Sequence, residues 1–211
     1  TATGPRRVIA PSFTNRAVQR YRDLAQRIVD DVLLDKVDGS ELRVVEEVGF
    51  RLPYSMTCDL LGVPEVDHPE ELRDWTWKCL DLIDAFPTPE QLRTNLEASA
   101  KLSAHLEDVL AWKRDHRGAD MFSAVLTAVD DGRMQAEQVV PYIHTLYLAG
   151  MHTTVNQTAL SLHALMQHRS QWELLRQRPE LLGNAVEELL RFEPTAHYMR
   201  RFGAVDIEIG G

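Results

Sequence analysis

A long apolar stretch over residues 136–167 constrains the fold of this chain most, because its hydrophobic residues recur at helical spacing. In its middle, residues 148–156 place one glycine and several polar side chains where a buried helix favours apolar ones. Gly150 costs about 1 kcal/mol of helix stability relative to alanine in a helix interior. A helix that contains it therefore indicates a use for the space that a side chain would fill. The alternative is a tolerated glycine, with Thr153 and Thr154 bonded back to helix carbonyls.

A second pattern lies downstream of this helix. Glu188 and Arg191 are spaced i and i+3, so their side chains share one helix face and can form a bidentate ion pair. Such a pair on its own is usually a solvated surface bridge that contributes little. Residues 205–211 then alternate apolar and acidic side chains before two glycines, which is typical of a half-exposed strand that ends in a turn.

Together these segments resemble the bacterial cytochrome P450 family of haem-thiolate monooxygenases. The family's central helix carries Ala/Gly-Gly-x-Asp/Glu-Thr-Thr, and this chain matches it except for His152 in the acidic position. Five matches in the family's order extend over essentially the whole chain, which makes a chance resemblance of some other helical binding domain a remote alternative. In chain order they are residues 6–14, residues 52–64, residues 149–154, the Glu-x-x-Arg of Glu188 and Arg191, and a basic residue before a strand, Arg201.

The resemblance implies catalytic roles for two side chains of the central helix. Thr153 would donate a hydrogen bond during oxygen activation, and His152 would relay protons from solvent in place of the usual acid. The unperturbed imidazole pKa of about 6.5 makes both protonation forms accessible. For His152 the alternative is a solvent-side residue bonded to a carbonyl. Ala149, Gly150 and Asn156 would line the groove that admits dioxygen.

The resemblance also implies residues that bind haem and substrate. Arg6 and Arg201 would bind the haem propionates through charge-assisted hydrogen bonds, with Arg7 and Arg200 as their competitors. Glu188 and Arg191 would form a structural ion pair in a buried charge network. The expected substrate-lining residues are Ile143, Tyr147, His197 and Tyr198, together with residues 80–86.

The proximal haem ligand is the main departure from the family. In the family a cysteine thiolate binds the haem iron, in a Phe-x-x-Gly-x-x-x-Cys-x-Gly loop that follows the Gly-Gly strand. Neither Cys58 nor Cys79 lies in such a loop, and both are expected to be free core thiols. The chain is therefore expected to be a fragment of a haem b protein, with the proximal cysteine missing, and to be inactive alone. The alternative is a naturally short protein.

The function that the resemblance implies is insertion of one oxygen atom from O2 into a small hydrophobic organic substrate, such as a secondary metabolite, a terpenoid or a steroid-like molecule. A ferredoxin or flavodoxin-like protein would supply the electrons. The alternative is a haem-free relative that stabilises a glycosyltransferase, because such partner proteins lack the haem cysteine.

The expected fold is mainly α, a P450-like helical fold with small β elements, truncated at both ends, in one partial domain over residues 1–211. The net charge of −9 argues against a nucleic-acid partner, and no apolar run is long enough for a membrane span. Free thiols indicate a cytoplasmic protein. The first residues are expected to be poor helix formers, because they include Thr3, Gly4 and Pro5. A short strand is expected over residues 42–45. Helices are expected over residues 16–36, 46–61, 70–85, 90–115, 121–129, 136–167 and 170–176, and around Glu188.

Overall fold

The computed structural model describes residues 3–34, 39, 41–67, 69–81, 87–198 and 208, and the side chains of these from residue 6 onward. The chain divides into two compact units, Thr1–Val155 and Asn156–Gly211. The elements are α1 (Thr3–Ile9), η1 (Ala10–Phe13), α2 (Asn15–Leu34), the π-helix η2 (Val44–Phe50), α3 (Arg51–Leu61), α4 (Glu70–Asp81), α5 (Pro89–Asp115), α6 (Met121–Asp130), η3 (Ala136–Gln138), α7 (Val139–Gln167), α8 (Arg169–Gln177), η4 (Pro179–Leu181) and α9 (Leu182–Phe192).

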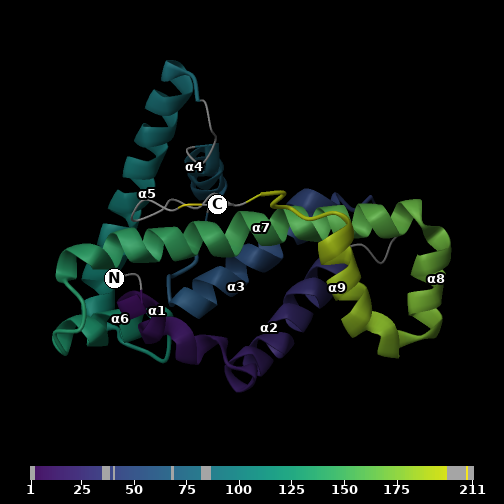
Figure 1. The fold of residues 1–211 in the computed structure, drawn as a ribbon, viewed down its shortest axis with the longest axis horizontal. Helices are drawn as coiled ribbons and strands as arrows, with labels where there is room; N and C mark the ends of the chain where they lie inside the picture. The colour runs from purple at the N-terminus through teal and green to yellow at the C-terminus, as the bar shows by residue number, and fades with distance from the viewer. Residues whose placement is uncertain are drawn as a thin grey trace. The chain divides into compact units, whose positions relative to one another are not determined.

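The expected mainly α fold is confirmed, because every regular element of the described residues is helical. In the first unit α4 and α5 lie side by side (Figure 1), and α5 begins with a capping box between Thr88 and Gln91. The Thr88 hydroxyl accepts a hydrogen bond from the Gln91 amide, and the Gln91 side chain accepts one from the Thr88 amide. Two backbone amides that the helix leaves without partners are thereby satisfied.

The helix α7 is the central element of the first unit's core. Every fourth residue from Val139 to Val155 is almost completely buried, because residues four apart share one helix face. Burial of each such side chain contributes about 1.5–3 kcal/mol. On another face of the same helix Thr145, Ala149 and Thr153 are exposed. The buried row consists of Val139, Ile143, Tyr147, Met151 and Val155.

A buried ion pair joins the ends of three helices in the same unit. The Lys113 ammonium of α5 lies 2.7 Å from the Asp120 carboxylate, and it also donates a hydrogen bond to the Gly62 carbonyl at the end of α3. Asp120 in turn accepts a hydrogen bond from the Ser123 amide, as the N-cap of α6. Because the pair is also hydrogen-bonded to these backbone groups, the cost of burying two charges is offset.

Two local expectations were wrong. Residues 42–45 form no strand: Leu42 and Arg43 have no regular structure, and η2 begins at Val44. The Arg43 amide donates to the Glu47 carboxylate, and the Glu47 amide donates to the Arg43 carbonyl, which favours a helical start over an extended one. The segment that begins at Thr3 is helical despite Pro5, since proline is tolerated in the first turn of a helix, where its missing N–H has no partner anyway.

Other helix boundaries agree with expectation to within a few residues. Pro53 lies in the first turn of α3, which explains why it does not interrupt that helix. The predicted helix over residues 70–85 is confirmed up to Asp81, and residues 82–86 lie outside the described residues. The strand predicted within residues 205–211 also lies outside them, apart from Glu208.

We predict that Gly62→Ala lowers the free energy of unfolding by about 2 kcal/mol or more. Gly62 has a φ of 74°, and a Cβ there would lie 2.2 Å from Cγ of Asp120, within the buried ion pair. Urea denaturation measures the effect. Gly132→Ala is the matched control, because Gly132 has a φ of 69° with nothing within 4 Å of the added Cβ. It should cost only about 1 kcal/mol. Equal effects of the two substitutions would contradict the packing of Asp120 against Gly62.

Candidate functional site

Gly150 lies at a close contact between two helices. A Cβ at this position would meet Thr57 of α3, with Oγ1 at 2.7 Å and Cγ2 at 3.2 Å. Thr57 is itself buried. The glycine therefore has a packing reason, since it allows α7 and α3 to approach each other at this point. Its role in admitting dioxygen stays a prediction.

Thr153 and Ala149 lie on the exposed face of α7. The Thr153 hydroxyl donates a hydrogen bond of 2.7 Å to the Ala149 carbonyl, which is the back-bonded arrangement that the sequence left open. A hydroxyl in this position can also accept a hydrogen bond or exchange its donor bond for another acceptor. The catalytic role of Thr153 and the groove role of Ala149 stay predictions, on a helix face that is open to a ligand.

His152 does not lie on the solvent side of α7, so that alternative is wrong. Its ring is 1% exposed, and neither ring nitrogen has a hydrogen-bond partner among the described residues. The indole of Trp77 on α4 contacts it, with ring centroids 4.2 Å apart. Burial lowers the pKa of His152 to about 4, so the imidazole is neutral at neutral pH. The unfolded chain binds a proton that the folded chain does not, so stability falls as the pH drops from about 6.5 toward 4.

The predicted substrate-lining residues occupy two kinds of environment. Ile143 and Tyr147 are completely buried in the core, where the Tyr147 hydroxyl lies 4.0 Å from the Cys58 sulfur. His197 and Tyr198 are exposed in the second unit. Asn156, the predicted groove residue, is half-buried. A plain core therefore explains Ile143 and Tyr147 without a substrate, and all these roles stay predictions.

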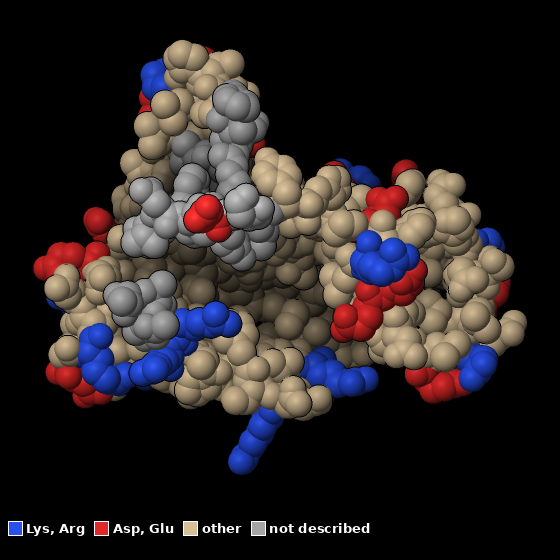
Figure 2. Space-filling model, in the orientation of Figure 1, with Lys and Arg blue, Asp and Glu red and all other residues tan. Residues whose placement is uncertain are grey.

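Of the two arginines predicted to bind the haem propionates, Arg6 lies among the described residues and Arg201 does not. Arg6 is exposed near the end of α1, as is its competitor Arg7. Arg201 and Arg200 lie outside the described residues. On the face shown in Figure 2, basic side chains gather over α1 and α2, although the whole chain is acidic. The exposed arginines of these two helices are Arg6, Arg7, Arg16, Arg20, Arg22 and Arg27.

Glu188 and Arg191 form the bidentate pair that their spacing predicts. Both nitrogen–oxygen distances are 2.7 Å, and the hydrogen bond from Arg191 lowers the pKa of Glu188. The expected buried network is not what the structure shows, because the two side chains are 59% and 70% exposed. Solvent screens an exposed pair, so it contributes little to stability.

Both cysteines are buried and free, as predicted. Burial raises the pKa of the Cys58 thiol to about 12 and also raises the pKa of Cys79. A thiol must ionise to bind a metal as a thiolate, so neither side chain is suited to that role. Within the described residues no group of three or more His, Cys, Asp or Glu side chains is placed to hold a metal ion.

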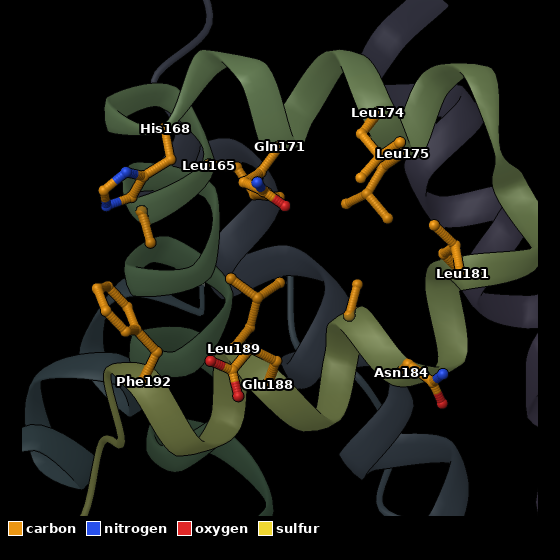
Figure 3. A pocket seen from close by; sticks show the side chains of 12 residues that line it. Leu165, His168, Gln171, Leu174, Leu175, Leu181, Asn184, Glu188, Leu189 and Phe192 are labelled. Atoms are coloured by element: carbon orange, nitrogen blue, oxygen red, sulfur yellow. The ribbon is translucent and has the colours of Figure 1, made fainter.

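The second unit contains an apolar cleft of about 450 Å³ that the sequence did not indicate. It is formed by the end of α7 with α8 and α9, and Figure 3 shows leucine side chains lining it, with His168 and Phe192 at one end. Their rings are 5.8 Å apart. Four apolar side chains of α9 are about half exposed, and Phe192 among them lines the cleft: Leu182, Val186, Leu190 and Phe192.

Known proteins with similar sequences are cytochromes P450. Nocardicin C N-oxygenase of Nocardia uniformis subsp. tsuyamanensis is 35% identical over 210 residues, which are 98% of this chain and 51% of that protein. Cytochrome P450 monooxygenase PikC of Streptomyces venezuelae is 35% identical over 212 residues, 98% of this chain and 49% of that protein. The crystal structure of CalO2 is 31% identical with a TM-score of 0.82, covering 91% of this chain and 48% of that one. No family model matches the chain.

The described residues have the mainly helical fold of part of a cytochrome P450 domain. Over nearly its whole length the chain is similar to bacterial cytochromes P450 in both sequence and fold. It spans about half the length of the curated relatives it matches. No helix of the described residues is long and apolar enough to cross a membrane.

We predict that Gly150→Ala destabilises the protein through Thr57 alone. The added Cβ lies 2.7 Å from the Thr57 hydroxyl. In a Thr57→Ala background that contact is gone, and the same substitution should stabilise by up to about 1 kcal/mol, the helix preference of alanine over glycine. A double-mutant cycle in urea measures the coupling. Additive effects of the two substitutions would contradict the contact.

We predict that Arg191→Ala leaves the unfolding midpoint in urea unchanged within error, because its pair with Glu188 is solvated. Arg93→Ala is the control, since Arg93 forms exposed pairs with Glu90 and Glu97 on α5 and their loss should also leave the midpoint unchanged. A large loss of stability for Arg191→Ala alone would show that the pair is buried in solution.

Proposed function

We propose that this chain is the oxygen-facing part of a haem-dependent monooxygenase that inserts one atom of O2 into an organic substrate. The observation that carries the proposal is the middle of α7. There the P450 pattern of residues 149–154 places Ala149 and Thr153 on an exposed helix face, beside a glycine that allows close packing on α3. The relatives that match nearly the whole chain support it, since they are named P450 monooxygenases and oxygenases.

The described residues fit one side of a haem site. Arg6 offers an exposed guanidinium suited to a propionate, and Thr153 offers an exposed hydroxyl. They do not fit the other side, because Cys58 and Cys79 are buried thiols whose pKa values are raised. No oxidation step therefore follows from the residues of this chain alone, and the haem b site is complete only with the rest of a P450 domain.

In that domain haem supplies the oxygen chemistry, and the residues of this chain orient groups and move protons. Thr153 would exchange its bond to the Ala149 carbonyl for a hydrogen bond toward the ligand. His152 would relay protons through its neutral ring, which has one donor and one acceptor nitrogen. Arg6 and Arg201 would hold the propionates, with Ala149, Gly150 and Asn156 lining the oxygen groove.

The proposed substrate is a small hydrophobic organic molecule, such as a secondary metabolite, a terpenoid or a steroid-like compound, with Ile143, Tyr147, His197 and Tyr198 along its path. The proposed electron donor is a ferredoxin or flavodoxin-like protein. Two buried free thiols fit the reducing conditions of the cytoplasm, which is the proposed location.

A second candidate is a haem-free partner protein that stabilises a glycosyltransferase. The observation in its favour is that neither described cysteine suits a thiolate ligand. Such a partner has no use for an exposed threonine beside a glycine on α7. A Phe-x-x-Gly-x-x-x-Cys-x-Gly loop encoded downstream in the gene supports the oxygenase, and a gene without that loop supports the partner protein.

The test of the oxygenase is product formed per electron consumed by the complete gene product. We predict that Thr153→Ala lowers this ratio by about 10²-fold, the size of a typical proton-transfer contribution, whereas Thr153→Ser retains most of it. Thr145→Ala is the matched control, because Thr145 is exposed on the same face of α7 and donates in the same way to the Pro141 carbonyl. Equal effects at both positions would contradict a specific role for Thr153.

A further inference from the structure

His152 is a buried polar side chain that makes no hydrogen bond to the described residues. It is 1% exposed, and both of its ring nitrogens lack a hydrogen-bond partner in the described part of the chain. A neutral imidazole carries one donor and one acceptor, and buried groups of this kind are almost always paired in folded proteins. The neighbouring residues of α7, from Leu148 to Asn156, contain no other ionisable side chain.

Trp77 is a partly exposed residue that contacts the buried His152 ring. Its indole contacts the imidazole with ring centroids 4.2 Å apart and a tilt of 49° between the planes. The same indole is 39% exposed. One part of Trp77 therefore meets water while another covers the buried ring, and both residues belong to the first unit.

Charged side chains line a cleft to which Trp77 also contributes. The cleft has a volume of about 320 Å³ and is lined by Glu46 of η2 and by Glu70, Asp74 and Arg73 of α4. Three carboxylates and one guanidinium would favour a protonated imidazole if they reached it through water. They do not, because burial is the cause of the lowered pKa of His152 and no charged group among the described residues contributes.

We propose that Trp77 is a positioning residue for His152: its indole excludes water from the imidazole and thereby decides whether His152 exchanges protons with solvent. The inference rests on the proposed function only in giving His152 the part of a proton relay. A dry, neutral ring cannot take protons from bulk water at neutral pH, so access past Trp77 controls the relay. Sequence offers no signal for this pairing, because the two residues are on different helices, 75 positions apart.

The test is a pH titration of the His152 ring nitrogens by NMR in the complete gene product with labelled histidine. The His152 signals are assigned by their loss in His152→Phe. In the wild type we expect a titration near pH 4, where burial places it. In Trp77→Ala, water and the cleft carboxylates reach the ring, and its proton affinity should rise by about tenfold or more. Trp77→Phe keeps an aromatic cover and should remain near the wild type.

Trp112→Ala is the matched control. Trp112 is 42% exposed and stacks on another histidine, His116, with ring centroids 4.5 Å apart. Its removal should leave the titration of His152 unchanged. An unchanged titration in Trp77→Ala would overturn the proposal, and so would a wild-type His152 that titrates near its ordinary pKa of about 6.5.

Two features keep the result decisive. If Trp77→Ala does not fold, Trp77→Leu retains apolar volume without the full indole and should give an intermediate rise in proton affinity, and no rise there would overturn the proposal. Neither measurement needs haem or turnover. Failure of this inference therefore leaves the oxygenase proposal standing, and a protein that binds no haem leaves the role of Trp77 standing.

Discussion

The contact between α7 and α3 at Gly150 and Thr57 is the constraint on which the first unit depends. A side chain at position 150 would collide with the Thr57 hydroxyl, so the two helices can approach only with glycine there. This approach allows the row from Val139 to Val155 to be buried against the rest of the core. Burying that row removes far more apolar surface from water than one glycine costs in helix propensity.

The same arrangement separates the two sides of α7 chemically. The buried side is apolar, except for His152, which is neutral beneath the Trp77 indole. The exposed side carries Ala149 and Thr153, the residues that the P450 pattern assigns to oxygen. A helix that anchors a core on one side can hold a reactive hydroxyl in a fixed position on the other, because its rotation is set by packing.

The helices of this protein follow from its sequence because apolar periodicity and caps are local, and so does the pairing of Glu188 with Arg191. Burial of that pair could not be predicted, since exposure depends on what packs over α9. The contacts of Thr57 with Gly150 and of Trp77 with His152 could not be predicted from the sequence either, because they join residues on different helices. The strand predicted over residues 42–45 is absent although Val44 and Val45 favour one. Hydrogen bonds between Arg43 and Glu47 stabilise a helical start there instead.

The most direct test of the account is a reduced carbon-monoxide difference spectrum of the complete gene product, with the 211-residue chain beside it. Because Cys58 and Cys79 are buried thiols, the chain alone should give no thiolate-type Soret band, whereas the complete product should give one. That pair of results would establish a haem-thiolate protein with this chain as its oxygen-facing part. The absence of any haem signal from the complete product would contradict the account.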